Sequence, residues 1–231
     1  HEALDEFIRA TEWPPAGDAL DRLLAIGRDR FGGAMARPGV RAFWWPRFER
    51  MAAWFVTQLQ RDALDGISEP LASEVRGELK IEVAGGFEVY GKADRIDRDP
   101  EGRLIVIDYK TGAVPTSSSV VSGFSPQLPL EGLIAMAGGY DGIDAGEVVG
   151  MTFWQLGGGD PAGKIIRVKG DIGELLEQER DRLFQLITVF NDEKTPYLAQ
   201  PRPDRGPRYS DYSHLERLGE WTVEDQRDEN E

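Results

Sequence analysis

The sequence predicts an α/β fold in which a mixed central β-sheet is flanked by helices. The first observation behind this prediction is a change of period at Ser73, where apolar and polar residues begin to alternate as in a half-buried strand. The second is the three- and four-residue spacing of apolar side chains before and after the strands, which indicates amphipathic helices. Helices, a meander of strands, a helix, two strands and a last helix follow one another, and this order fits one layered domain.

The length of 231 residues also suits one large domain, which we expect over residues 1–219, with an acidic tail at 220–231. Its expected parts are, in order, a helical N-terminal part (1–72), a meander of strands with the candidate functional residues (73–112), a helix–strand–helix part (113–195) and a C-terminal packing segment (196–219). The chain begins with His1 rather than Met and shows no signal-peptide pattern, so we expect it to be a piece of a longer protein.

Three helical segments are expected in the N-terminal part, and the middle one has a looser pattern than the other two. Residues 1–11 place His1, Leu4 and Ile8 on one face. A long helix from Pro38 to about Leu64 repeats large apolar side chains at helical spacing: Phe43, Trp44, Phe48, Met51, Trp54, Phe55 and Leu59. We expect these side chains to pack on the core. The alternative is a platform on which nucleic-acid bases stack.

Composition limits the chemistry that the chain can carry. It has no cysteine, which excludes disulfides, thiolate zinc sites, iron–sulfur clusters and cysteine nucleophiles. With two histidines, a metal site must rely on Asp and Glu, and these favour Mg²⁺ or Mn²⁺. No run of about 18 apolar residues exists, so no membrane span is expected. The net charge of −14 counts against nucleic-acid binding, but residues 37–61 hold five arginines and one glutamate, so local basic stripes remain.

The meander contains three expected strands. In the first, apolar residues alternate with charged ones, of which Glu74, Glu78 and Glu82 are expected to be solvated. The alternative for Glu74 is that it reaches a metal site. The second strand runs back over 87–96; in it Arg95 is expected to pair with a neighbouring carboxylate, while Asp97 begins the following turn and can cap it. The third, residues 104–108, is almost wholly apolar, as in a strand buried on both faces.

Charged residues gather where the third strand ends. Asp108 and Lys110 are two apart and so project from the same face. If the hairpin pairs symmetrically about Glu101, Asp94 lies opposite Asp108, with Cβ atoms about 4.5–5.5 Å apart. Two such carboxylates repel each other unless a cation lies between them, so the pattern predicts a divalent-metal site. The alternative is a strand that ends in charge because the chain reaches solvent there.

Four segments together resemble the RecB-type PD-(D/E)xK nucleases: HEALDEF at 1–7, GKADRID at 91–97, IDYKTG at 107–112 and QLPLE at 127–131. The resemblance implies a restriction-endonuclease-like core with a mixed sheet flanked by helices. It also implies that His1, Asp94 and Asp108 bind the metal, together with the main-chain carbonyl of Tyr109.

The resemblance assigns further roles beside the metal. Lys110 would contact the attacking water or the scissile phosphate, and Gln127 would orient the substrate. Many RecB-type relatives carry a tyrosine four residues after this glutamine. Here that position is Glu131, so the aromatic role does not carry over.

Within that family, the QLPLE segment and the ending TPYLAQPRP…YSDYSHLERLGEW resemble the AddB-type nuclease domains. This resemblance implies a Mg²⁺- or Mn²⁺-dependent DNA exonuclease, cytoplasmic and nucleoid-associated, within a helicase–nuclease that processes double-strand breaks. Its substrate would be single-stranded DNA from a duplex end, and its partner the AddA subunit. Lacking cysteines, the chain would be the iron–sulfur-free subtype, with its C-terminal segment held by packing of Tyr209, Tyr212, Leu215 and Trp221. The alternative is a catalytically silent nuclease-like module that binds DNA or docks the partner subunit.

Overall fold

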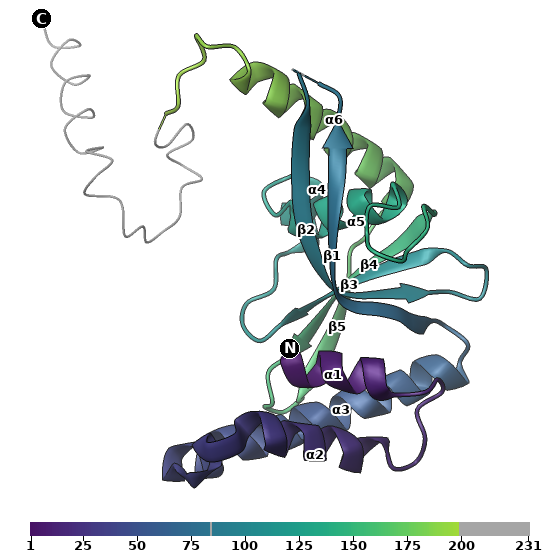
Figure 1. The fold of residues 1–231 in the computed structure, drawn as a ribbon, viewed down its shortest axis with the longest axis vertical. Helices are drawn as coiled ribbons and strands as arrows, with labels where there is room; N and C mark the ends of the chain where they lie inside the picture. The colour runs from purple at the N-terminus through teal and green to yellow at the C-terminus, as the bar shows by residue number, and fades with distance from the viewer. Residues whose placement is uncertain (84, 199–231) are drawn as a thin grey trace, which may run out of the picture. The chain divides into compact units, whose positions relative to one another are not determined.

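The computed structural model describes residues 1–83 and 85–198 (Figure 1). It divides into a compact unit of residues 1–188 and a second unit that begins at Val189. The acidic tail and almost all of the expected C-terminal packing segment lie outside the described residues. The expected packing of Tyr209, Tyr212, Leu215 and Trp221 lies outside them too, so these remain predictions.

A five-stranded mixed sheet forms the centre of the first unit. Its strands are β1 (Glu69–Ile81), β2 (Phe87–Arg98), β3 (Leu104–Lys110), β4 (Val148–Leu156) and β5 (Gly163–Arg167). They lie in sequence order; β3 and β4 run parallel, and every other neighbouring pair is antiparallel. The predicted mixed sheet is therefore confirmed, and its one parallel pair is connected by the crossover that contains helix α5 (Gln127–Met136).

Helices cover both faces of this sheet (Figure 1). The helices are α1 (Glu2–Ala10), α2 (Ala19–Phe31), the 3₁₀ turn η1 (Gly32–Ala36), the π turn η2 (Val40–Trp44), α3 (Trp45–Leu64), α4 (Ser117–Val121), α5 (Gln127–Met136) and α6 (Ile172–Phe190). Strand β3 divides two cores by its alternation: Val106 packs toward α5, whereas Ile107 and Tyr109 pack toward α1–α3. Within the described residues, no helix is long and apolar enough to cross a membrane.

Several boundaries differ from the predicted ones. Strand β1 begins at Glu69, before the alternating pattern starts at Ser73, and β2 continues to Arg98. Asp97 is consequently buried inside β2 and caps no turn. Asp99 does so instead, because its carboxylate accepts hydrogen bonds from the backbone N–H groups of Glu101 and Arg103.

The long aromatic helix is partly as predicted. Phe48, Phe55 and Leu59 are buried in the core beneath the sheet, which confirms the packing interpretation for these residues. Trp45, which was not among the expected side chains, is buried with them. Phe43 and Trp44 are instead 72% and 59% exposed, because the π turn before α3 directs them away from that core.

Two glycines allow α5 to lie close on the β1–β2 hairpin. Gly77 and Gly91 are directly opposite each other in the ladder. A Cβ at Gly91 would lie 2.6 Å from a methyl carbon of Ile134, and one at Gly77 would lie 2.4 Å from the ring of Tyr140. Side chains at these positions would have to displace Ile134 or Tyr140, so the glycine pair allows the C-terminal half of α5 to pack closely on the hairpin.

Candidate active site

The candidate site lies where β2 parts from β3. The predicted register is confirmed, because the ladder from Arg98↔Leu104 to Arg95↔Ile107 is symmetric about Glu101. The ladder ends at Arg95, one residue before the expected pair of Asp94 and Asp108. Instead of continuing it, Asp94 accepts a hydrogen bond of 2.7 Å from the backbone N–H of Tyr109 through Oδ2. The side chain thus replaces a ladder bond and leaves its other oxygen, Oδ1, facing away from the sheet.

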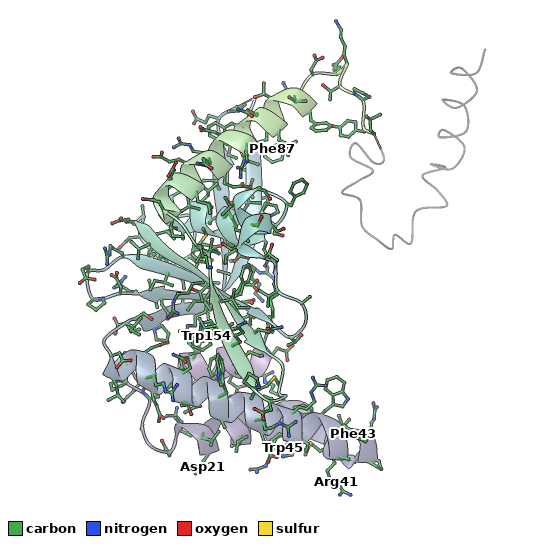
Figure 2. The ribbon with its side chains drawn as sticks, turned by 180° about the vertical axis from the view of Figure 1, so that it is seen from behind. Asp21, Arg41, Phe43, Trp45, Phe87 and Trp154 are labelled. Atoms are coloured by element: carbon green, nitrogen blue, oxygen red, sulfur yellow. The ribbon has the colours of Figure 1, made fainter. Side chains whose placement is uncertain are left out.

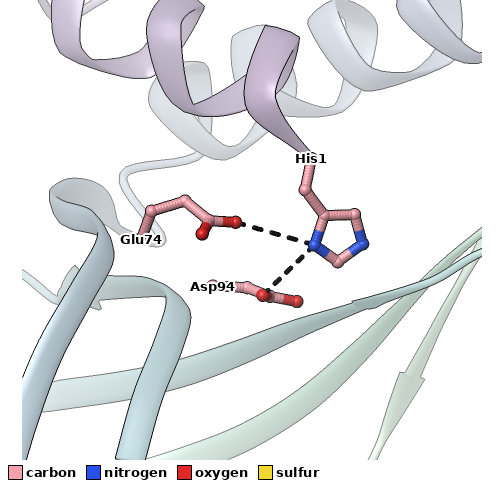
Figure 3. A group of neighbouring side chains, drawn as sticks. All are labelled: His1, Glu74 and Asp94. Atoms are coloured by element: carbon pink, nitrogen blue, oxygen red, sulfur yellow. Dashed lines mark ion pairs between the residues drawn. The ribbon is translucent and has the colours of Figure 1, made fainter.

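The side chains of His1, Glu74 and Asp94 meet beside that oxygen, with both ion-pair contacts converging on the imidazole of His1 (Figure 3). Nδ1 of His1 lies 3.3 Å from Oδ1 of Asp94 and 3.6 Å from Oε1 of Glu74. One ligand atom from each residue lies within 4.8 Å of the others, close enough for a single cation. His1 caps the start of α1, Glu74 comes from β1 and Asp94 from β2, so three separate elements build this cluster.

Glu74 belongs to this cluster. It was expected to be a solvated side chain on the polar face of the first strand, and this expectation is wrong. Its side chain is 16% exposed and also forms an ion pair with Lys92. Its backbone has a φ of +50°, a left-handed conformation that costs a non-glycine residue free energy and is concentrated at functional sites. The signal that could have identified Glu74 was the pairing register of β1 with β2. The pairs Ser73↔Arg95 and Val75↔Ala93 place Glu74 beside Asp94.

A second group of polar side chains lies on the α5 side of the sheet. Lys110 Nζ donates to Asp108 Oδ1 at 2.9 Å and to Gln127 Oε1 at 3.0 Å. The amide nitrogen of Gln127 donates to the same Asp108 oxygen at 2.8 Å and to Glu131 Oε1 at 3.1 Å. The structure therefore brings the expected residues Asp108, Lys110 and Gln127 into one network and adds Glu131 to it.

Burial makes the carboxyl groups of this network basic. Asp108 is 1% exposed, and burial raises its pKa above the ordinary value, against the lowering effect of Lys110. Burial raises the pKa of Glu131 to about 8. Asp108 Oδ2 and Glu131 Oε2 are both buried and accept no hydrogen bond from the described residues. Buried carboxylate oxygens without partners are costly, which fits a site that is completed by a cation or a bound substrate.

The pKa of His1 depends directly on the carboxylates of the cation cluster beside it. The Asp94 carboxylate beside its imidazole raises the pKa of His1 above 6.5 and outweighs burial, which lowers it. Glu74 and Asp108 raise the pKa further. Three carboxylates therefore surround the imidazole, and such a concentration of negative charge favours the binding of a cation.

Behind the site, Arg95 is fully buried and binds Asp97 with two hydrogen bonds of 2.6 and 2.5 Å. The expected pairing of Arg95 with a neighbouring carboxylate is thereby confirmed. Its guanidinium also lies 4.4 Å from the ring centroid of Trp154. Tyr109 contributes a buried ring 5.8 Å from the His1 ring. The role expected for the Tyr109 carbonyl stays a prediction.

Comparison with known proteins finds relatives that share part of this chain. The chain is 26% identical over 143 residues to an uncharacterized protein of Rickettsia bellii, which covers 61% of this chain and 17% of that protein. It is 38% identical over 69 residues to an uncharacterized protein of Rickettsia felis, covering 29% of this chain and 8% of that protein. The chain thus spans less than a fifth of the length of these relatives. A solved structure titled "Crystal structure of SSO0001" is 18% identical with a TM-score of 0.30, covering 73% of this chain and 68% of that one.

The family comparison covers the whole site. The model of the PD-(D/E)XK nuclease superfamily matches residues 1–209, a range that contains the cation cluster, the Asp108 network and all five strands. The chain belongs to the PD-(D/E)XK nuclease superfamily.

Proposed function

We propose that this domain is a divalent-metal-dependent deoxyribonuclease that hydrolyses phosphodiester bonds, with Mg²⁺ or Mn²⁺ as its cofactor. The observation that carries the proposal is the meeting of His1, Glu74 and Asp94 within 4.8 Å beside the network of Asp108, Lys110 and Gln127. Acidic, cationic and amide groups are then available on one small area of the sheet, as hydrolysis of a charged phosphodiester requires.

The residues present fit a hard divalent cation. Two carboxylates and one imidazole supply the cluster, and these donors suit Mg²⁺ and Mn²⁺. The unpartnered Asp108 Oδ2 is a further oxygen on the neighbouring strand. We propose His1, Glu74, Asp94 and Asp108 as the ligands, with the Tyr109 carbonyl as the further ligand that the family resemblance implies. The absence of cysteine agrees with a domain that holds no iron–sulfur cluster.

A divalent cation at this site would polarise a phosphate oxygen and lower the pKa of a bound water. The side chains around it have roles of their own. Lys110, held between Asp108 and Gln127, keeps its ammonium group where negative charge develops on a phosphate. The Gln127 amide nitrogen donates to the carboxyl groups of Asp108 and Glu131, so its orientation is determined and it can position a DNA strand beside Lys110.

More specifically, we propose a RecB-type exonuclease domain of AddB that acts within an AddAB helicase–nuclease. Its substrate would be single-stranded DNA that the helicase delivers from a broken duplex end for recombinational repair. Its partner would be AddA, and the complex would work in the cytoplasm at the nucleoid. The motif set and the C-terminal sequence support this proposal.

The test is cleavage of end-labelled single-stranded DNA with Mg²⁺, repeated with EDTA and with Asp108→Ala. We expect both changes to reduce cleavage at least about a hundredfold, because each removes charge stabilisation at the site. Asp181→Ala is the control, since this aspartate is 65% exposed on α6. Cleavage that survives Asp108→Ala would overturn the site assignment. No cleavage by the full helicase complex with any divalent cation would favour the catalytically silent module.

A further inference from the structure

Phe43 and Trp44 are consecutive exposed residues where the π turn enters α3. Figure 2 shows Phe43 and Arg41 at the end of this helical layer, beyond the buried Trp45. Phe43 is 72% exposed and Trp44 59% exposed, whereas Trp45 is 8% exposed. Neither exposed ring belongs to the cation cluster or to one of the two hydrophobic cores, so the proposed site leaves this aromatic pair unexplained.

The backbone that carries the two exposed rings is firmly held. Trp45 makes edge contacts with Phe31 and a tilted contact with Phe48, with ring centroids 5.7 and 5.5 Å apart. Arg28 of α2 lies 5.3 Å above the ring of Trp45. Because the next residue is anchored in this way, Phe43 and Trp44 lie on a rigid base and lose little entropy when they bind a planar ligand.

Arginines lie close to the pair along the chain. Between 37 and 50 the chain has four arginines, all exposed, and Glu49 is the single acidic residue. Arg47 lies 5.6 Å from the ring centroid of Trp44 and donates to the Gly157 carbonyl at 2.8 Å. Among the described residues, the side chains of Arg37 and Arg41 have neither an ion pair nor a hydrogen bond, so their charges are available. In a chain of net charge −14 this is a locally basic surface.

We propose that residues 37–50 form a binding surface for single-stranded nucleic acid, separate from the cation cluster. Bases stack on Phe43 and Trp44, and Arg37 and Arg41 bind the phosphates. Aromatic rings combined with cations are the chemistry by which proteins hold single strands without reading their sequence. The inference rests on the proposed nuclease function, because that function requires a strand to pass over this domain.

The binding test uses the Asp108→Ala protein in EDTA, so that it does not depend on cleavage. The probe is a fluorescent oligothymidylate, followed by anisotropy. We expect Phe43→Ala with Trp44→Ala to weaken binding at least about tenfold, since each stacked base contributes substantially. Tyr90→Ala is the matched control, because Tyr90 is 69% exposed but lies beside Glu88 on β2, and it should leave affinity unchanged.

The phosphate contacts have their own test. Arg37→Glu with Arg41→Glu should weaken binding and flatten its salt dependence, by about 0.7 in the slope of log affinity against log salt for each lost phosphate contact. Affinity that is unchanged in the aromatic double variant would overturn the proposal. So would competition by polyglutamate as effective as by unlabelled oligothymidylate, since that result would indicate a docking surface for an acidic protein.

Cleavage kinetics separate this surface from the catalytic site. With otherwise native protein and Mg²⁺, the aromatic double variant should raise KM for a long single strand about tenfold and leave kcat unchanged. A fall in kcat with unchanged KM would contradict the proposal. A protein that binds through this surface but never cleaves would leave the surface valid and refute the nuclease function, so the two failures are distinguishable.

Discussion

Glu74, His1 and Asp94 show how single side chains from distant parts of the sequence complete a cation site. Each alone is an ordinary polar residue of a helix start or a strand. Together their ligand atoms lie within 4.8 Å, where the affinity for a cation depends on the number of charged ligands. Glu74 is the member whose contribution the family resemblance does not assign, so its substitution is the informative one.

We expect Glu74→Gln to weaken Mn²⁺ binding at least about tenfold, because one anionic ligand is lost while the size of the side chain is kept. The measurement is isothermal titration calorimetry. Glu78→Gln on the same strand is the control, since Glu78 is 44% exposed and pairs with Lys80. Equal Mn²⁺ affinity of both variants would show that Glu74 is not a ligand.

The raised pKa of His1 predicts how cation binding depends on pH. The imidazole must be neutral to bind a cation, and Asp94 favours its protonated form. Protons should therefore compete from above pH 6.5, and below the raised pKa the apparent affinity should fall about tenfold per pH unit.

Calorimetry with Mn²⁺ in buffers of different ionisation enthalpy should then detect the release of about one proton per cation in this pH range. The same pH dependence in His1→Ala would contradict the assignment of this proton to the imidazole.

Among the elements, α5 connects the core with the candidate site. It lies directly on Gly77 and Gly91, and its first residue, Gln127, holds both Lys110 and Asp108. One turn later Glu131 turns a carboxyl group into the same buried space, 5% exposed. Helix α5 therefore places a buried, titratable carboxyl group, that of Glu131, next to the proposed catalytic residues.

The free energy of unfolding should depend on the ionisation of Glu131. Because the folded-state pKa of Glu131 is about 8, against 4.5 ordinarily, the folded protein retains a proton that the unfolded chain releases. Stability should thus decline as pH rises from about 4.5 to about 8, by at most about 1.4 kcal/mol per pH unit.

Glu131→Gln cannot ionise, so its free energy of unfolding should improve relative to the native protein as pH increases through this range. Urea denaturation at several pH values measures the difference. Glu179→Gln is the control, since Glu179 is equally buried but paired with Arg182. A difference that does not change with pH would refute the prediction.

At the scale of the whole molecule, one sheet separates two cores and a buried ion pair lies among its strands. Arg95 and Asp97 come from β2, Ser68 just before β1 donates to Asp97 at 2.8 Å, and Trp154 of β4 lies against the guanidinium. This group connects the strands on both sides of β3 directly behind the cation cluster. Breaking it should affect the whole fold.

We expect Asp97→Ala to lower the free energy of unfolding by about 3–5 kcal/mol, because Arg95 would keep its buried charge without a partner. Asp97→Leu combined with Arg95→Met should cost clearly less, because that variant removes both charges. Chemical denaturation of the three proteins measures these changes. A loss below about 1 kcal/mol in Asp97→Ala would show that the pair contributes little.

Much of the architecture was predictable because local periodicity and register are properties of neighbouring residues. The alternation after Ser73 and the symmetry about Glu101 led to the meander and its register, both confirmed. Strand ends were less predictable, and β1 begins earlier, at Glu69, because its pairing with β2 continues beyond the alternating pattern. Exposure of Phe43 and Trp44 was not predictable either, since helical spacing does not reveal a π turn.

The sequence by itself determined the strand order of the meander, the chemistry of the donors and the candidate residues Asp94, Asp108 and Lys110. Only the tertiary structure decided that Asp94 replaces a ladder bond, that Glu74 turns toward His1, and which aromatic side chains stay outside the core. The physical reason is distance along the chain. A period of two or 3.6 residues is written in adjacent positions, whereas a cation cluster depends on how three separately folded elements pack together.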